Sequence, residues 1–137
     1  MESATPHYTL TFDGGSKGNP GLGYGSYEIR TSDNRFRVER REFGDGVTNN
    51  EAEYRALIEG LSDIVQTLRK NGKDPHAYRV KVLGDSQLVI KQLNGQYKVK
   101  HPGMLVLNEQ AKALASQFAQ VTFNWHERSN SVKILGH

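Results

Sequence analysis

Residues 8–21 of the chain, Tyr-Thr-Leu-Thr-Phe-Asp-Gly-Gly-Ser-Lys-Gly-Asn-Pro-Gly, carry the first fold signal. From Tyr8 to Phe12 apolar and polar side chains alternate in a composition rich in aromatic and β-branched residues, which predicts a strand. From Asp13 to Gly21 most residues are Gly, Asn, Ser or Pro, which favour turns. This stretch therefore predicts a strand over residues 8–12 that runs into a long turn beginning at Asp13.

Two further strands are expected after this turn, over residues 24–30 and 35–43. Three consecutive strands with short connections favour an antiparallel meander. The clearest helix follows, because Thr48 and Glu51 have the spacing of a capping box. Apolar residues then recur at helical spacing up to Gly72, the expected stop. These apolar positions are Ala52, Leu57, Leu61, Ile64, Val65 and Leu68.

The rest of the chain alternates between strand and helix patterns. A strand is expected over residues 78–83, a short helix over 86–93, an amphipathic helix from Pro102 to Phe118 and a last strand over 121–125. This order predicts an α/β fold with a five-stranded mixed sheet, in which three antiparallel strands are followed by helical crossovers and flanked by helices. The twelve residues after Trp125 leave room for a shortened C-terminal helix.

Length and composition narrow the class of protein. The 137 residues fit one domain, with residues 1–6 expected to be a flexible tail. The start of the chain lacks the features of a signal peptide, and no apolar run is long enough for a membrane span. The absence of cysteine excludes disulfides, thiolate metal sites and a cysteine nucleophile. We therefore expect a cytoplasmic protein, and its net charge of +3 permits a polyanionic partner without requiring one.

Three acidic residues lie where the expected elements begin or end, namely Asp13, Glu53 and Asp85. Converging carboxylates repel one another unless a cation neutralises them, and oxygen ligands alone favour a hard ion such as Mg²⁺ or Mn²⁺. Two such ions about 4 Å apart can activate water and stabilise the leaving oxygen in phosphodiester cleavage. Each acid taken alone is more often explained as a turn or cap residue.

Glu51 and Glu53 are two residues apart, so on a helix they point in widely different directions. Glu51 has a sufficient structural role in the capping box. Glu53 has no such role, which makes it the better candidate for a metal ligand.

Three motifs resemble those of the type 1 ribonucleases H, in the family's order and over nearly the whole chain. Residues 11–21 resemble the opening motif, residues 48–57 (Thr-Asn-Asn-Glu-Ala-Glu-Tyr-Arg-Ala-Leu) the second, and residues 84–89 (Gly-Asp-Ser-Gln-Leu-Val) the third. The resemblance implies a ribonuclease H-like fold in which Asp13, Glu53 and Asp85 hold two divalent ions. It also implies that an RNA–DNA hybrid is recognised by Gly14, Gly15, Ser16, Asn19, Asn49 and Asn50.

Short polar side chains and close backbone approach suit the reading of ribose 2′-hydroxyls and minor-groove edges. Capping preference is the alternative explanation for Asn49 and Asn50, and turn formation is the alternative for Asn19.

The chain departs from the family in two places. The stretch from Gln96 to Pro102 stands where some members carry a basic protrusion; its Lys98, Lys100 and His101 are either phosphate contacts or a solvated turn. We also see no separate hybrid-binding domain, and expect weaker binding than in members that have one.

The second departure is that the family's fourth acid, expected after the last strand, is not matched by any Asp. Asn130 lies nearest its place and can bind a hard ion through its amide oxygen, with Glu127 as the other candidate. His126 and His137 are possible replacements for the family's mobile histidine.

The sequence thus predicts a monomeric metal-dependent endoribonuclease that cuts the RNA strand of RNA–DNA hybrids and leaves 5′-phosphate ends, with no membrane or protein partner. A catalytically silent hybrid-binding module is the main alternative, because the fourth acid is missing. Another nuclease or strand-transfer enzyme of the same fold is a further one, which the Asn-rich second motif disfavours.

Overall fold

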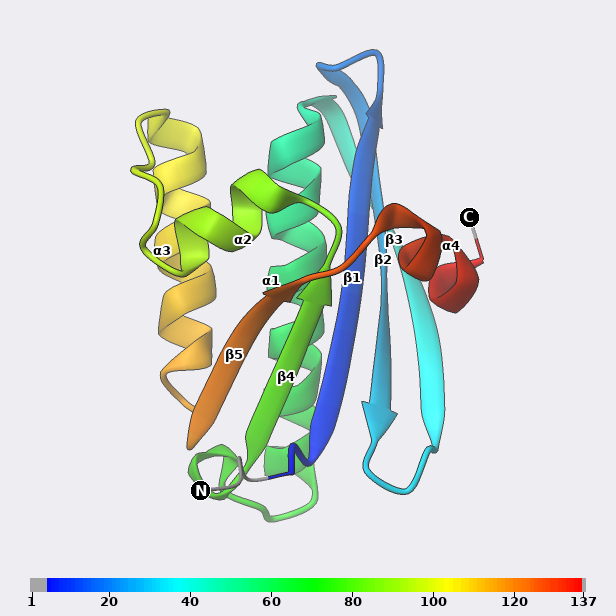
Figure 1. Cartoon of the computed structure of the whole chain (residues 1–137), viewed down its shortest axis with the longest axis vertical. Helices are drawn as coiled ribbons and strands as arrows, with labels where there is room; N and C mark the ends of the chain where they lie inside the picture. Colours follow the sequence, from blue (N-terminus) through cyan, green and yellow to red (C-terminus); the bar gives the residue numbers. More distant parts are fainter. Residues whose placement is uncertain (1–4, 137) are drawn as a thin grey trace.

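The structure is a computed structural model that describes residues 5–136. Five strands form a single mixed sheet in the order β3-β2-β1-β4-β5 (Figure 1). Their bounds are β1 (Tyr8–Lys17), β2 (Gly21–Thr31), β3 (Phe36–Val47), β4 (Arg79–Gly84) and β5 (Gln120–Trp125). Neighbours among β1, β2 and β3 are antiparallel, whereas β4 pairs in parallel with both β1 and β5. The predicted mixed sheet is therefore confirmed.

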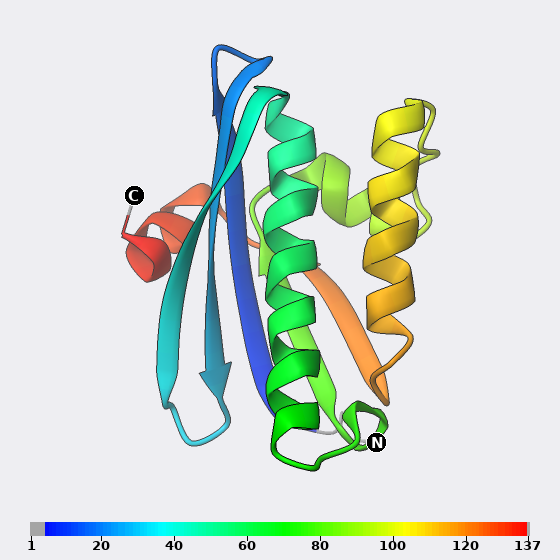
Figure 2. The ribbon, with the colours of Figure 1, turned by 180° about the vertical axis from the view of Figure 1, so that it is seen from behind.

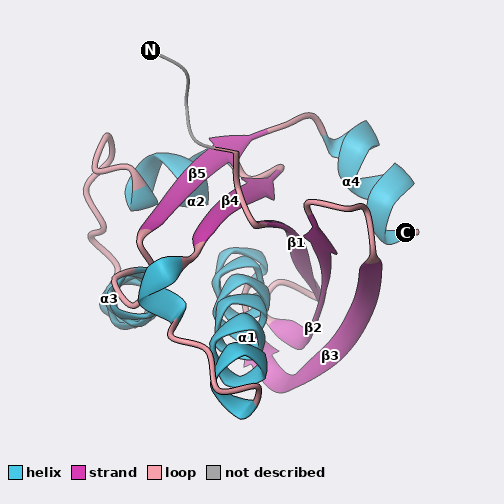
Figure 3. Ribbon diagram, turned by 90° about the horizontal axis from the view of Figure 1, so that it is seen from below, coloured by secondary structure: helices cyan, strands magenta, loops and turns pink. Residues whose placement is uncertain are grey.

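The helices form two unequal layers on the sheet. The long helix α1 (Asn49–Lys70) and α3 (Pro102–Ala115) cover one face, and the short α2 (Gln87–Leu93) contacts both of them (Figure 2). The eight-residue helix α4 (Arg128–Leu135) lies on the opposite face against β1 and β2 (Figure 3). This is the shortened C-terminal helix that the sequence predicts. A 3-10 helix at Pro75–Ala77 was not expected.

The prediction that the first strand ends at Phe12 is wrong. β1 continues to Lys17, because Gly14 and Gly15 pair with Gly25 and Tyr24 of β2. The glycines of this stretch serve close packing instead of a turn. A Cβ atom at Gly14 would collide with the backbone carbonyl of Ala52, so only glycine lets α1 lie this close to β1.

The core lies between the sheet and α1. The capping box that the sequence predicts is present, with the Thr48 hydroxyl accepting from the Glu51 N–H and the Glu51 carboxylate accepting from the Thr48 N–H. Leu57 and Leu61 of α1 are fully buried against the sheet. Burial of each such side chain stabilises the fold by roughly 1.5–3 kcal/mol, so α1 is held firmly at the position from which Glu53 projects.

The remaining sequence predictions concern the N-terminal tail, membrane spans, the oligomeric state and the location of the protein. Of the expected flexible tail, residues 1–4 lie outside the described residues, while the backbone oxygen of Thr5 accepts hydrogen bonds from the Arg79 guanidinium at 2.8 and 3.2 Å. Between residues 5 and 136, no helix is both long and apolar enough to cross a bilayer. The monomeric state and the cytoplasmic location stay predictions.

Candidate metal centre and its cavity

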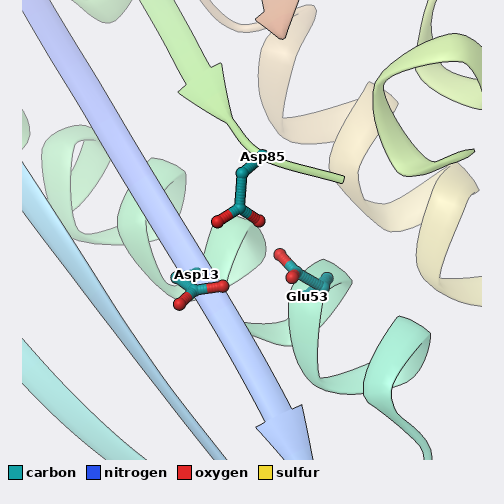
Figure 4. Close-up of side chains that lie close together, drawn as sticks. All are labelled: Asp13, Glu53 and Asp85. Atoms are coloured by element: carbon teal, nitrogen blue, oxygen red, sulfur yellow. The ribbon is translucent and has the colours of Figure 1, made fainter. Parts of the chain in front are cut away.

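Three carboxylates converge where β1, β4 and α1 meet. Asp13 projects from β1, Glu53 from the first turns of α1 and Asp85 from the residue after β4 (Figure 4). One carboxylate oxygen from each lies within 4.8 Å of the other two. Asp13 and Glu53 are only 6% and 5% exposed, and the Asp85 side chain is 1% exposed. The structure thus brings together three of the four predicted ligands.

The sheet register and one glycine explain this convergence. β1 and β4 are adjacent parallel strands in the middle of the sheet, and Phe12 lies opposite Gly84, so the residues that follow them are neighbours. Asp13 lies inside β1 and not in a turn after it. Because Gly14 allows α1 to approach β1, Glu53 can reach the same place from the helix.

The electrostatics of this cluster favour the protonated form of Glu53. Burial raises the pKa of the Glu53 carboxyl well above its ordinary value, and the negative charges of Asp13 and Asp85 raise it further. A hydrogen bond between the Glu53 and Asp13 side chains acts in the same direction. Without a cation, therefore, Glu53 holds its proton to a higher pH than an ordinary glutamate does.

The oxygen atoms of the cluster fit a hard divalent cation. Glu53 Oε2 and both carboxylate oxygens of Asp85 are buried without a hydrogen-bond partner among the described residues. Burying carboxylate oxygens unpaired is costly, and a cation bound among them removes that cost. Three converging carboxylates with no sulfur ligand are the donor set that Mg²⁺ and Mn²⁺ accept. The cluster can therefore hold a divalent metal.

The carboxylates open into a cavity of about 960 Å³. Four of the six residues predicted to bind substrate line it, namely Gly14, Gly15, Asn49 and Asn50. Further residues that line it, which sequence reasoning missed, are Tyr24, Gly25, Ser26, Arg40, Arg41, Glu42, Ser86 and Arg128. The opening is thus bordered by glycines and amides near α1 and by charged and hydroxyl side chains on β2, β3 and α4.

Ser16 and Asn19, the other two predicted substrate residues, do not line the cavity. The Ser16 N–H donates to Asn49 Oδ1 at 2.8 Å, and the Asn49 N–H donates to Asn19 Oδ1 at 2.9 Å. These bonds tie the β1–β2 turn to the start of α1. The amide oxygens of Asn49 and Asn19 already accept hydrogen bonds in this arrangement. Each side chain therefore offers a ligand chiefly its amide N–H groups.

The proposed fourth ligand is not beside the other three. Asn130 is exposed in the first turn of α4, does not line the cavity, and its backbone N–H donates to the Glu127 oxygen at 3.0 Å. Glu127 is exposed as well and precedes α4 without a capping hydrogen bond from its side chain. Arg128 is the residue of this helix that reaches the cavity, and the fourth ligand stays a prediction.

His126 and His137 are the two possible replacements for the family's mobile histidine. His126 is half-buried, and its Nε2 lies 2.7 Å from the Ser131 hydroxyl. Burial lowers the pKa of His126, partly offset by the nearby charges of Asp85 and Asp13, so this ring is neutral near pH 7. His137 lies outside the described residues.

The stretch that replaces the basic protrusion has one residue with a structural role. His101 Nδ1 accepts from the backbone N–H groups of Gly103 and Met104 at 3.1 and 3.4 Å, and so caps α3. Lys98 and Lys100 are exposed. Their contact with phosphate stays a prediction.

A family model and a curated relative both match most of the chain. The family model described as "Reverse transcriptase-like" matches residues 11–133. The bifunctional protein Rv2228c of Mycobacterium tuberculosis is 42% identical over 120 residues, which are 87% of this chain and 31% of that protein. The chain therefore spans about a third of the length of this curated relative.

Two solved structures are similar over almost the whole chain. The N-terminal RNase H domain of Rv2228c, solved as a fusion with maltose binding protein, has a TM-score of 0.81 and 38% identity, covering 94% of this chain and 88% of that chain. LC11-RNase H1 in complex with an RNA/DNA hybrid has a TM-score of 0.82 and 26% identity, covering 92% and 89%.

Proposed function

The chain belongs to the reverse transcriptase-like family and has its ribonuclease H-like fold, and we propose that it is a metal-dependent endoribonuclease. Its substrate in this proposal is the RNA strand of RNA–DNA hybrids. The observation that carries this proposal is the buried trio of Asp13, Glu53 and Asp85 beside a cavity of about 960 Å³. Glu53 Oε2 and both Asp85 carboxylate oxygens have no hydrogen-bond partner among the described residues. The structure of a similar protein with a bound hybrid supports the choice of substrate.

In this proposal the three carboxylates hold two Mg²⁺ or Mn²⁺ ions, with Asn130 as the candidate fourth ligand. When bound, such ions activate water and neutralise the charge that develops during phosphodiester hydrolysis, which leaves a 5′-phosphate on one product. Glu53 must lose its proton to serve as a ligand, so metal binding releases a proton from the cluster. Asp13, on the strand beside β4, would hold the metal together with Asp85 and Glu53.

The residues near α1 are suited to position an RNA strand. Gly14 and Gly15 line the cavity beside the carboxylates with backbone alone. Asn49 and Asn50 line the same opening at the start of α1, and the Asn49 amide oxygen is already bonded to the Ser16 N–H. Asn49 thus presents N–H donors, which suit the oxygen of a ribose 2′-hydroxyl or a base acceptor in the minor groove. Ser16 and Asn19 act indirectly, by fixing Asn49.

A catalytically silent hybrid-binding module is the second candidate. The exposed position of Asn130 away from the cavity favours it, because a site with three ligands holds its ions less tightly. Against it stand three buried acids whose mutual repulsion destabilises the fold and contributes nothing to binding a polyanion.

Cleavage of a hybrid with a 5′-labelled RNA strand distinguishes the two candidates. We expect wild-type protein to cut in Mg²⁺ or Mn²⁺ and not in EDTA, and Asp13→Asn to bind the hybrid without cutting it. Wild-type protein that binds the hybrid and leaves the RNA intact across a titration of both metals would identify a binding module. Undiminished cutting in EDTA would rule out the metal-dependent mechanism.

A further inference from the structure

One wall of the cavity is built by residues to which the proposed catalysis gives no role. Asp13 of β1 lies opposite Ser26 of β2, and Ser26 lies opposite Arg40 of β3. Cross-strand neighbours share a face of the sheet, so these side chains form a row on one face. Helix α4 packs against that face of the sheet (Figure 3). Two steps of roughly 4.8 Å between strands place the Arg40 backbone about 10 Å from that of Asp13. Arg128 at the start of α4 lines the same cavity, and we call Ser26, Arg40 and Arg128 the α4 wall.

Arg40 carries a positive charge that no acidic side chain in the described part of the chain neutralises through an ion pair. Its Nη2 donates to the backbone oxygen of Leu135, at the end of α4, at 3.2 Å. The next residue behaves differently, because Arg41 forms an ion pair with Glu39 at 3.5 Å and donates to the Tyr27 hydroxyl at 3.1 Å. Of these two neighbours on β3, Arg40 is thus the one with charge to offer a ligand.

Arg128 is the second cation of this wall. Its side chain is 70% exposed, and its Nη2 lies 3.9 Å from Asp85 Oδ1, which is an ion pair without a hydrogen bond. A cation bound by Asp85 would neutralise that carboxylate and weaken its hold on Arg128. The guanidinium would then be free for another anion, and its planar set of donors matches phosphate oxygens.

We propose that the α4 wall binds the backbone of the strand being cut, with Arg128 contacting phosphate close to the carboxylates and Arg40 contacting phosphate farther along the same strand. This inference rests on the proposed function, which supplies the RNA–DNA hybrid. A strand carries one phosphate per roughly 3.4 Å of helix axis, so about 10 Å corresponds to roughly three phosphates. Arg40 therefore contacts the second to fourth phosphate from the cut, on one side of it.

The first test measures how hybrid binding depends on salt. Fluorescence anisotropy measures binding of a labelled hybrid to Asp13→Asn protein, which cannot cut it. The same measurement is made on three double variants that combine Asp13→Asn with Arg40→Ala, Arg128→Ala or Arg69→Ala. Arg69 is the matched control, because it loses the same charge but donates to Gln117, away from the cavity. Each α4-wall variant should bind about fivefold or more weakly and lower the slope of log K against log salt by about one, whereas Arg69→Ala should change affinity less than about twofold.

Arg40→Ala also removes a hydrogen bond to the end of α4, which could destabilise the fold. A second variant therefore distinguishes the loss of charge from the loss of this hydrogen bond. Arg40→Lys keeps the charge without the guanidinium geometry. It should restore most of the salt dependence if Arg40 contacts phosphate. Failure of Arg40→Lys to restore the slope, with both variants folded by circular dichroism, would assign Arg40 a purely structural role and overturn the proposal.

The second test locates the contacts on the substrate. Single phosphates in the RNA strand are replaced in turn by uncharged methylphosphonates. One replacement, two to four phosphates from the cut, should weaken binding of the protein with Arg40 but not of Arg40→Ala. Equal losses in both proteins at every position would overturn the proposal. Wild-type protein that does not cut any hybrid would instead reject the proposed function, so the two failures are distinguishable.

Discussion

Replacing Glu53 by Gln should stabilise the metal-free protein and remove an unusual dependence of its stability on pH. Burial and the charges of Asp13 and Asp85 raise the folded-state pKa of Glu53 above its ordinary value of 4.5. Well below pH 4.5, Glu53 holds its proton in both the folded and the unfolded state, so it contributes no pH dependence there. Above pH 4.5 the unfolded chain loses this proton while the folded protein keeps it, so rising pH favours unfolding.

The size of the effect follows from one proton. Where the folded state binds one more proton than the unfolded state, the free energy of unfolding falls by about 1.4 kcal/mol per pH unit. Between pH 5 and pH 7 the wild-type protein should therefore lose up to about 2.7 kcal/mol through Glu53. Gln cannot titrate, so Glu53→Gln should lose none of this. The difference is a large part of the roughly 5–15 kcal/mol that stabilises a typical domain.

Urea denaturation in EDTA at several pH values measures this difference, and Glu51 provides the matched control two residues away. The N–H of Thr48 lowers the pKa of the Glu51 carboxylate, so its stabilisation is lost as pH falls below its ordinary range and not as pH rises. Glu51→Gln should therefore retain the wild-type fall between pH 5 and pH 7. Parallel pH profiles for wild type and Glu53→Gln would refute the reasoning. Saturating Mg²⁺ should stabilise the wild type more than Glu53→Gln, because metal binding offsets the repulsion.

Three further outcomes are expected. Glu53→Gln should lower the steady-state rate of hybrid cleavage by orders of magnitude, whereas Glu51→Gln, which keeps a capping-box partner, should cost little; the opposite ranking would place the wrong carboxylate in the site. In a metal titration of cleavage, Asn130→Asp should keep or raise activity at low metal, and Asn130→Ala should lose most of it. Mn²⁺ should be more effective than Mg²⁺ for the wild type. An alanine variant with full activity would show that the fourth ligand lies elsewhere. Gly14→Ala should destabilise the protein by roughly 1–3 kcal/mol in urea denaturation and reduce cleavage, because its Cβ would force α1 away from β1; a fully stable, active variant would contradict the close packing described here.

Local signals in the sequence predict α1 and the three converging acids. The capping box of Thr48 and Glu51 and the apolar positions behind it depend only on residues a few places apart, so they can be recognised without tertiary information. Asp13 and Asp85 follow apolar strand patterns, and the parallel pairing of β1 with β4 then places them side by side. The three acids were therefore predictable as a group.

Features that depend on strand pairing were not predictable. Local propensity assigns residues 13–17 to a turn, but pairing with β2 and the packing of α1 make this stretch part of β1. With the first strand predicted to end at Phe12, the row from Asp13 through Ser26 to Arg40 could not be recognised. The sequence likewise gives no means to tell that Arg128, and not Asn130, faces the cavity from α4.

The most direct test of the account compares three duplexes of one sequence, RNA–DNA, RNA–RNA and DNA–DNA, incubated with wild-type protein and Mg²⁺ or Mn²⁺ and resolved on a denaturing gel. The account predicts internal cuts in the RNA strand of the RNA–DNA hybrid alone, with 5′-phosphate ends on the products. An intact hybrid under both metals, or equal cutting of all three duplexes, would contradict it.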